Sequence, residues 1–327
     1  MSRVLFNQLV IFFDNNHSHY KQYFLISGKY GVKKIYKLFF WLMKTIYRNT
    51  HTKSYHHNKN LWPFFQLKRN ENNAIISCSY CFKKINLISN DDIFKIKKND
   101  TISLCFSGPS VSKIDDDYFK DNNLDYLGVN GSISLKAKAG VDFLFYVIID
   151  ETFIRSRRDL VKIIIQNNEL ILFCNYRVII AIFSDFKFND IKCKIKIIET
   201  IHKNIGYRFL GKSEIISSNE YSFFWFNGYG FSNHLDEYFF DYGTVAYVSL
   251  QIAVALGYKK INLIGLDMNN FNSPRFYESD NNKLPSVLED DFIDIDNAFL
   301  TASIYCENKS ISVNNLSEHS AIIHFNK

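Results

Sequence analysis

Proline and cysteine are both scarce in this chain of 327 residues, which has four prolines and six cysteines. With 47% hydrophobic and 22% charged residues, the composition excludes a largely disordered protein and predicts a globular chain with ample core for one large domain. No secretory segment is recognisable, because the apolar start Val4 to Phe13 lacks a small-residue cleavage site. The cysteines therefore fit a reducing cytoplasm better than a disulfide framework.

Long apolar runs and metal-binding spacings are missing as well. Charges interrupt the longest apolar candidates before they reach the roughly 18 residues of a membrane-spanning helix. Cys78 and Cys81 form a lone CxxC without a second pair or a nearby histidine pair, which argues against a zinc site. Asp115 to Asp117 look like an acidic metal clamp, but we interpret them as the acidic first turn of a helix. We therefore expect no metal.

Positive charge is in modest excess, with a net charge of +6, and part of it gathers near the N-terminus. Gly31 to Arg48 places apolar residues at helical spacing and carries five basic residues, which predicts a basic amphipathic helix in a leader of residues 1–50. Such a helix is typical of a segment lying on an anionic membrane surface, and it equally suits a helix packed on the rest of the protein. No base-reading pattern is present, so nucleic acid is not an expected partner.

Two further segments follow this leader. Residues 51–98 begin with a polar stretch rich in histidine and asparagine and continue with short strand-like pieces, which predicts a linker and a hairpin. Residues 99–327 alternate buried strands and helices, which predicts one α/β domain.

The stretch Thr101 to Asp115 predicts a strand, a tight turn and the start of a helix. In the turn, Gly108 allows a close approach of the backbone to a ligand, and Pro109 suits the first turn of a helix. Backbone N–H groups would then point at an anion such as a nucleotide phosphate. The turn lacks the Walker lysine and the three-glycine fingerprint, so a plain connection between strand and helix remains the alternative.

Carboxylates are predicted at the same edge of the sheet. Tyr242 to Asn270 reads as a helix that is apolar nearly all round, a glycine at its end, and a short buried strand followed by Asp267. The buried strand Phe143 to Ile149 likewise ends at Asp150. Open α/β sheets bind their ligands at the carboxyl ends of the strands, so both carboxylates become candidates for a site.

These segments, FSGPSVSKID, LGVNGSISL, FLFYVIID and YGTVAYVSLQIAVALGYKKINLIGLD, follow an order that resembles bacterial glycosyltransferases using CMP-activated acidic sugars. The chain is similar to the CMP-sialic acid transferases of lipooligosaccharide and to the RfaZ-type lipopolysaccharide core proteins, thought to add 3-deoxy-octulosonic acid (Kdo). The resemblance covers about Asn99 to Ile311 and is most specific in ALGYKKINLIGLD. It implies a Rossmann-like α/β/α sandwich with a mostly parallel sheet, a variant of the GT-A fold. It further implies a mobile segment at 269–297, inverting chemistry, and no obligatory metal or cofactor.

Individual residues match the family's nucleotide site. The resemblance matches Ser107, Gly108, Pro109 and Ser110 to the loop that lies against the cytidine monophosphate, and Asn130 to an asparagine that contacts the nucleotide. Thr244 and Asp267 match the polar residues that bracket the long helix and the strand after it, and Thr244 is a further candidate for binding the nucleotide. The sialyltransferases carry a histidine base in the mobile segment, whereas residues 269–297 contain seven acidic residues and no histidine. Ser107 also stands where the family usually has asparagine. These departures favour Kdo over sialic acid as the transferred sugar.

The chemistry of a ketosyl donor defines the groups that a site needs: donors for the leaving phosphate and a base for the acceptor hydroxyl. Asp150 is our first candidate for the base, and capping of the helix after it is the alternative. The hydroxyl of Tyr242 is a candidate donor to the phosphate, and Asp267 is the third candidate catalytic residue. Arg155, Arg157 and Arg158 could bind a sugar carboxylate or form a solvated helix face.

Three hypotheses follow from the sequence. The first is a cytoplasmic transferase, peripheral on the inner face of the inner membrane, that moves Kdo or a related acid from CMP to a lipopolysaccharide core sugar. The second keeps this reaction but takes sialic acid as the sugar. The third is a non-catalytic protein of the same fold in envelope assembly.

Overall fold

The computed structural model describes residues 31–71, 74–81, 83–217, 222–269, 271–286 and 288–326. The chain divides into two compact units, residues 1–63 and 64–327. In the first unit, α3 (Gly31–Thr50) covers the range for which the sequence predicts a helix, and the 3₁₀ helix η1 (Lys53–Asn58) follows it. The apolar start Val4 to Phe13 lies outside the described residues.

A seven-stranded sheet organises the second unit, and every neighbouring pair in it runs parallel. This confirms the predicted α/β class with a mostly parallel sheet. In spatial order the strands are β16 (Ser312–Asn315), β15 (Lys260–Ile264), β4 (Thr101–Cys105), β5 (Leu124–Val129), β6 (Phe145–Ile148), β7 (Ile171–Cys174) and β8 (Lys194–Ile197).

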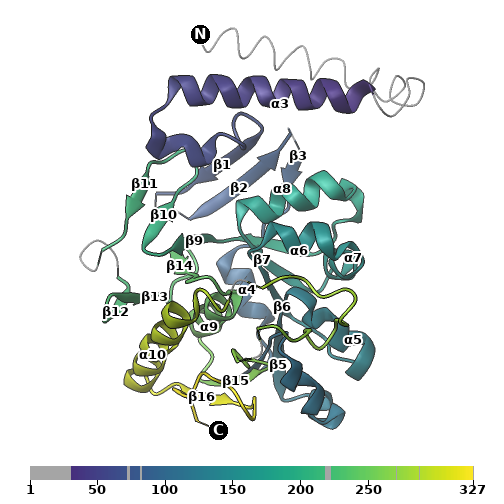
Figure 1. Cartoon of the computed structure of the whole chain (residues 1–327), viewed down its shortest axis with the longest axis vertical. Coiled ribbons are helices and arrows are strands. Elements are labelled where there is room, and N and C mark those ends of the chain that lie inside the picture. The colour runs from purple at the N-terminus through teal and green to yellow at the C-terminus, as the bar shows by residue number, and fades with distance from the viewer. Residues whose placement is uncertain are drawn as a thin grey trace. The chain divides into compact units, whose positions relative to one another are not determined.

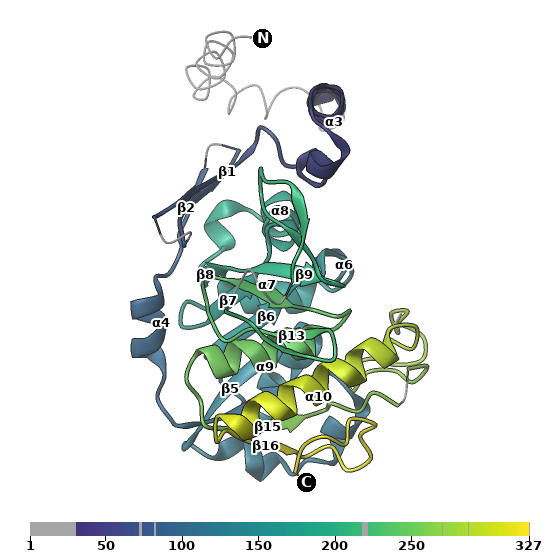
Figure 2. The same cartoon turned by 90° about the vertical axis from the view of Figure 1, so that its left-hand side faces the viewer.

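Helices cover both faces of this sheet, as Figures 1 and 2 show. On one side lie α9 and α10, and on the other lie α5 to α8 (Figure 1). The α-helices of the unit are α4 (Asn90–Ile96), α5 (Ser134–Ala139), α6 (Glu151–Ser156), α7 (Arg158–Gln166), α8 (Tyr176–Asp185), α9 (Val245–Ala255) and α10 (Phe292–Asn308). Short 3₁₀ helices are η2 (Pro109–Lys113), η3 (Asp116–Lys120), η4 (Asn130–Ile133) and η5 (Phe188–Asp190).

Three small sheets accompany the main one. The first is antiparallel and includes the hairpin expected after the linker; it consists of β1 (Phe65–Arg69), β2 (Ile75–Tyr80) and β3 (Lys83–Ile85). The second has the order β11 (Ser213–Ile215), β10 (Ile205–Tyr207), β9 (Glu199–His202) and β14 (Tyr238–Phe240). The third pairs β12 (Phe224–Phe226) with β13 (Tyr229–Phe231).

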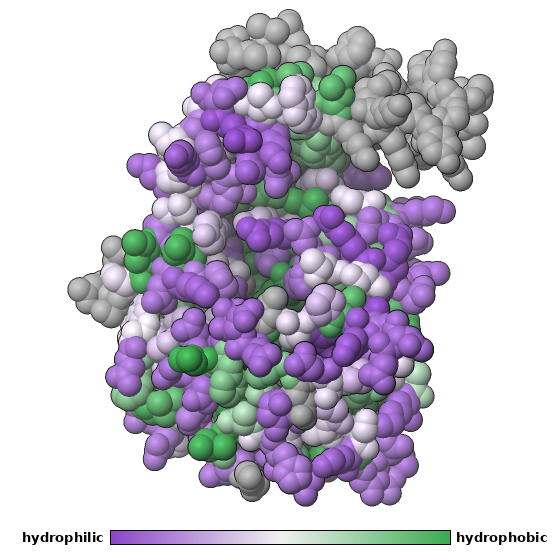
Figure 3. Space-filling view, viewed as in Figure 1, coloured by the Kyte–Doolittle hydropathy of each residue, from purple (hydrophilic) through white to green (hydrophobic). Residues whose placement is uncertain are grey.

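On the face of the molecule drawn in Figure 3, hydrophilic residues cover most of the surface and hydrophobic residues gather in small separate groups. Some large apolar side chains are nevertheless well exposed, among them Leu38 and Trp41 of α3. None of the described helices is long and apolar enough to cross a membrane.

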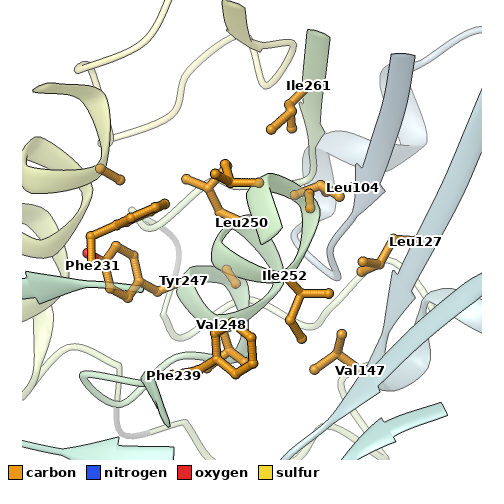
Figure 4. Packing of buried hydrophobic residues seen from close by; sticks show 14 of the residues in the cluster. Leu104, Leu127, Val147, Phe231, Phe239, Tyr247, Val248, Leu250, Ile252 and Ile261 are labelled. Atoms are coloured by element: carbon orange, nitrogen blue, oxygen red, sulfur yellow. The ribbon is translucent and has the colours of Figure 1, made fainter. Parts of the chain in front are cut away.

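The core centres on α9, whose residues Ala246 to Val254 are all buried. This confirms the prediction of a helix that is apolar nearly all round. Figure 4 shows Ile252 of α9 beside Leu127 and Val147 of the sheet, while Tyr247 faces Phe231. Each large apolar side chain buried in this way contributes about 1.5–3 kcal/mol. Because α9 runs into β15, its first residues lie at the edge of the sheet where the parallel strands end.

Candidate active site

The direction of strand order reverses between β4 and β15, because the chain builds β4 to β8 outward on one side and adds β15 and β16 on the other. The segments that follow these two strands are joined by backbone hydrogen bonds. Phe106 N donates to Ile264 O at 2.8 Å, and Gly108 N donates to Gly265 O at 3.1 Å. Such a reversal is the place where open α/β sheets form their ligand crevice. The predicted loop and the predicted carboxylate therefore lie together.

Asp267 is in contact with the predicted phosphate loop. Its Oδ2 accepts a hydrogen bond from Ser110 N at 2.9 Å, and the residue is 6% exposed. A Cβ added to Gly108 would lie 2.3 Å from that oxygen and 2.5 Å from Gly265 O, so the loop has no room for a larger residue here. The carboxylate thus fixes the shape of the loop that the sequence analysis assigned to the nucleotide.

One part of the loop prediction was wrong. The turn leads into two five-residue 3₁₀ helices, η2 and η3, instead of an α-helix, and the N–H of Ser110 is already bonded to Asp267. Fewer backbone N–H groups are therefore free to bind an anion here than at the start of an α-helix. The acidic turn behaves as interpreted, since Asp115 caps η3 by accepting a hydrogen bond from Asp117 N. The reason is local: Ile114 has an extended backbone, which stops the helix after one turn.

Two buried side-chain oxygens at this edge have no hydrogen-bond partner among the described residues, Ser110 Oγ and Asn130 Oδ1. Asn130 follows β5 directly and has a φ of 45°, in the left-handed region that non-glycine residues rarely adopt. Its carbonyl oxygen accepts a 2.6 Å hydrogen bond from the hydroxyl of Tyr146, which holds this backbone in place. A strained residue with an unpaired buried oxygen is a feature of ligand sites.

The segment 271–286 lies against these loops. Phe276 N donates to Ser107 O at 3.3 Å. The ring of Tyr277 lies on Gly131, where an added Cβ would come within 2.0 Å of it. Burial raises the pKa of Tyr277 to about 12, so its hydroxyl keeps its proton at neutral pH. The resemblance implies a mobile segment in this range, and Phe276 and Tyr277 are the residues through which it contacts the loops.

An ion pair fastens this segment to the end of α6. Arg157 Nη2 lies 2.7 Å from Glu278 Oε1, and the side chain of Glu278 is 1% exposed. Arg275 Nη1 lies 3.2 Å from the same carboxylate. Burial raises the pKa of Glu278, but the hydrogen bond from Arg157 and the charge of Arg275 outweigh it and leave the pKa below its usual value. Glu278 is therefore a charged, almost fully enclosed carboxylate beside the site.

Asp150 lies at the carboxyl end of β6 and is exposed. Its Oδ1 accepts a 2.8 Å hydrogen bond from Thr152 N, which makes it the N-cap of α6. Its second oxygen, Oδ2, accepts a hydrogen bond from the hydroxyl of Thr152, so the capping alternative describes its present contacts. The helix after Asp150 is interrupted at Arg157, where φ is −127°, so that α6 ends and α7 begins there.

Tyr242 and Thr244 lie just before α9 and are both buried. The hydroxyl of Tyr242 accepts a hydrogen bond from Gly230 N at 2.7 Å and donates to Asn204 Oδ1 at 3.0 Å. Burial raises the pKa of Tyr242, so it stays protonated. Thr244 caps α9 by accepting a hydrogen bond from Ala246 N. Both hydroxyls are engaged within the protein.

A histidine–carboxylate pair near these residues was not found from the sequence. His202 Nδ1 lies 2.8 Å from Asp241 Oδ1, and the histidine side chain is about half exposed. The hydrogen bond to Asp241 raises the pKa of His202. The next residue, Lys203, lies 3.0 Å from Asp291, the residue before α10. No local signal could reveal this pair, because its members are 39 residues apart and meet only through the pairing of β9 with β14.

A cavity of about 420 Å³ lies elsewhere, lined among others by Arg69, Glu199 and Asp236, and none of the predicted site residues lines it. Within the described ranges, no group of three or more His, Cys, Asp or Glu side chains is arranged to hold a metal ion.

Comparison with known proteins shows which family this chain resembles. A family model described as 3-deoxy-D-manno-octulosonic acid transferase WaaZ matches residues 87–326. A probable 3-deoxy-manno-octulosonic acid transferase of Escherichia coli K12 is 26% identical over 263 residues, which is 73% of this chain and 87% of that protein.

Two solved structures are similar at lower identity. The sialyltransferase CstII of Campylobacter jejuni, in complex with a substrate analogue, is 16% identical with a TM-score of 0.38, over 69% of this chain and 85% of that one. The MAf glycosyltransferase of Magnetospirillum magneticum AMB-1 is 13% identical with a TM-score of 0.44, over 74% of this chain and 34% of that one. Because the family match spans well over half of the sequence, this protein belongs to the family of 3-deoxy-D-manno-octulosonic acid transferases and is a glycosyltransferase.

Proposed function

We propose that the protein transfers Kdo, or a closely related acidic ketosugar, from its CMP donor to a sugar of the lipopolysaccharide core. The observation that carries the proposal is a pair of buried side-chain oxygens, in Ser110 and Asn130, that have no hydrogen-bond partner among the described residues. These two residues follow the neighbouring strands β4 and β5. Leaving such a group unpaired costs about 1–3 kcal/mol, so these positions are expected where a ligand completes the pairing. Family membership supports the sugar, and the matched loop Ser107 to Ser110 supports the nucleotide.

The reaction we propose is a single displacement with inversion at the anomeric carbon and without an obligatory metal. The acceptor hydroxyl gives its proton to a base and attacks the anomeric carbon, while the bond from that carbon to the phosphate oxygen breaks and CMP leaves. The hydroxyl of Ser110 would donate to the phosphate, and Oδ1 of Asn130 would accept a hydrogen bond from a hydroxyl or amino group of the nucleotide. The covering segment 271–286 would exclude water from the oxocarbenium-like transition state.

The remaining candidate residues receive positioning roles. Asp267 holds the loop through Ser110 N, which keeps Gly108 and Ser110 at the strand ends. The hydroxyl of Tyr242 connects Gly230 N to Asn204 Oδ1, and Thr244 caps α9. These contacts would set the shape of the nucleotide site before any ligand binds.

Asp150 is the base that we propose, and the structure suggests a clean test. Asparagine caps helices about as well as aspartate, whereas alanine does not. We expect Asp150→Asn to keep the melting temperature of the wild type and to lose about a hundredfold or more in kcat. Asp150→Ala should lose both activity and about 1 kcal/mol of stability. Wild-type turnover in Asp150→Asn would remove Asp150 as base and make the His202–Asp241 pair the next to test.

The proposed donor and mechanism are tested by release of CMP from CMP-Kdo and from CMP-sialic acid, with deacylated core oligosaccharide as acceptor. We expect turnover with CMP-Kdo in the presence of EDTA, and an NMR spectrum of the product that shows the inverted anomer. Turnover only with CMP-sialic acid would identify sialic acid, and not Kdo, as the transferred sugar. Absence of turnover with both donors, together with absence of CMP binding in calorimetry, would contradict the nucleotide site.

A further inference from the structure

We propose that Arg157 and Arg275 form the binding site for the carboxylate of the acidic sugar, and that Glu278 occupies this site when no donor is bound. The inference rests on the proposed function, because only an acidic sugar brings such a carboxylate. It assigns the sugar-recognition residues of the donor site and a role for the covering segment.

The three arginines that the sequence offered as carboxylate ligands have different partners. Arg155 pairs with Glu151 at 2.6 Å and Arg158 with Asp185 at 3.1 Å, and both arginines are more than half exposed. Arg157 is 18% exposed and turns to the covering segment. The pairs of Arg155 and Arg158 are surface ion pairs of little energetic weight, whereas Arg157 lies in an enclosed environment where a charged hydrogen bond is stronger.

The carboxylate of Glu278 accepts hydrogen bonds from two arginine side chains and, at 3.4 Å, from the backbone N–H of Leu284. Oε1 accepts from Arg157 at 2.7 Å, and both oxygens lie 3.2 Å from Arg275 Nη1. The backbone N–H of Arg275 donates to Oε2, also at 3.2 Å. Enclosing a carboxylate between two guanidinium groups costs desolvation energy that a hydrophobic contact would avoid, so such a pair is weak evidence for a purely stabilising role.

The position of this pair connects it to the nucleotide site. Glu278 directly follows Tyr277, whose ring lies on Gly131. The residue before Gly131, Asn130, has a buried Oδ1 without a hydrogen-bond partner among the described residues. Phe276, the residue before Tyr277, is bonded to Ser107 O of the loop. A sugar attached to a nucleotide at Ser110 and Asn130 would therefore lie next to Arg157. Its carboxylate has the same charge and the same two-oxygen geometry as that of Glu278, so exchange leaves the charge of the site unchanged.

A first experiment uses the wild-type chain saturated with CMP. Calorimetry compares free Kdo with its carboxyl methyl ester, which keeps the ring and its hydroxyls but lacks the negative charge. We expect the ester to bind about tenfold to a hundredfold more weakly, the usual loss when a charged hydrogen bond disappears. Equal binding of acid and ester would overturn the inference, and this comparison does not depend on whether transfer is observed.

Variants then separate recognition from structural fastening. We expect Arg157→Gln to raise the KM for CMP-Kdo about tenfold to a hundredfold while the Kd for CMP changes less than about twofold. Arg158→Gln, with its surface partner, is the matched control and should keep the wild-type KM. Glu278→Gln removes the internal competitor and should lower the KM for CMP-Kdo several-fold. A KM raised in Glu278→Gln as much as in Arg157→Gln would show a structural fastening and overturn the competitor role.

These outcomes are distinct from failure of the proposed function itself. Loss of CMP binding in the wild type would count against the nucleotide site, whereas intact CMP binding with no preference for the acid would count against Arg157 and Arg275. If Arg157→Gln fails to fold, the calorimetric comparison of Kdo with its methyl ester in the wild type still tests whether the site recognises a carboxylate.

Discussion

At the scale of single residues, the candidate site depends on positions with no space for a side chain. Gly108 lies against Asp267, and Gly131 lies against the ring of Tyr277. Neither glycine has a positive φ. These positions therefore require glycine because neighbouring atoms lie too close for a side chain, and the backbone conformation itself would suit other residues. Both contacts join segments that are more than 140 residues apart in the chain.

Gly131→Ala tests the contact with the covering segment. The added Cβ would lie 2.0 Å from the Tyr277 ring, so the segment must shift. We expect a loss of about 1–3 kcal/mol in the free energy of unfolding, which is typical of overpacking, and a lower kcat/KM. Urea denaturation and CMP release measure the two effects.

The double variant Gly131→Ala with Tyr277→Ala is the control for that experiment. In a protein that already carries Tyr277→Ala, adding Gly131→Ala should change the free energy of unfolding very little, because the ring that the new Cβ would meet is absent. Additive losses in the double variant would show that Gly131 is constrained by something other than Tyr277.

At the scale of elements, α9 is fixed to the small β-sheets by one polar side chain. Gln251 is fully buried, accepts hydrogen bonds from Ser232 N and Phe240 N, and donates to Phe240 O at 2.7 Å. These are the backbone groups of β14 and of the residue after β13. The glutamine therefore helps to set where β14, and hence Asp241 and Thr244, reach the edge of the site.

Gln251→Ala should destabilise the protein by about 2–4 kcal/mol, because it opens space in the core and leaves buried backbone groups unpaired. Ser303→Ala, at a half-buried position of α10, serves as a control and should change the free energy of unfolding by less than about 1 kcal/mol. Denaturant unfolding of both variants measures the difference. Equal stability of Gln251→Ala and the wild type would contradict the role of these hydrogen bonds.

The covering segment should respond to acid through Glu278. Its pKa in the folded protein lies below the ordinary value of 4.5, because the bonds from Arg157 and Arg275 outweigh burial. A carboxylate of this kind adds stability above the unfolded pKa and loses it as the pH falls through the folded value. We therefore expect the amides of Phe276 and Glu278 to lose protection from hydrogen exchange, relative to α9, as the pH falls below about 4.5.

Glu278→Gln provides the comparison, since its segment should show no such change over the same range. Protection that increases as the pH falls would contradict the sign of this prediction.

At the scale of the whole molecule, the basic helix α3 belongs to a unit of its own. Within this unit, Tyr47 is 1% exposed and stacks on His51 at 3.9 Å, so one side of the helix end is packed. Leu38 and Trp41, by contrast, are 64% and 61% exposed. Exposed apolar residues beside Lys44 and Arg48 fit the membrane interface, where we propose that the enzyme meets a lipid-linked acceptor.

We expect the full-length protein to sediment with anionic vesicles and much less with neutral ones. The double variant Leu38→Ala with Trp41→Ala should weaken vesicle binding by about tenfold or more, since both side chains would leave the apolar interface. Ile163→Ala, another exposed apolar residue, lies on α7 and should bind as the wild type does. Binding that is equal in all three proteins would favour the alternative of a helix packed within the protein.

Much of the fold could be predicted because its signals are local. The apolar run of α9, the left-handed Gly257 after it and the strand Lys260–Ile264 are set by neighbouring residues. The same holds for the placement of Asp150 and Asp267 at strand ends, since parallel strands share one edge. The length of the helix after Pro109 was mispredicted, because the extended backbone at Ile114 is not encoded by apolar spacing.

Periodicity and short motifs depend on adjacent residues, so the α/β class, the strand ends that carry the candidate site and the resemblance to transferases of acidic sugars could all be read from the amino-acid sequence. The contacts between distant residues became known from the folded structure: Asp267 with Ser110, Tyr277 with Gly131, Arg157 with Glu278 and His202 with Asp241. These pairs are separated by 39 to 157 residues in the chain. Their contacts follow from strand order and loop packing, and neither can be read from local spacing.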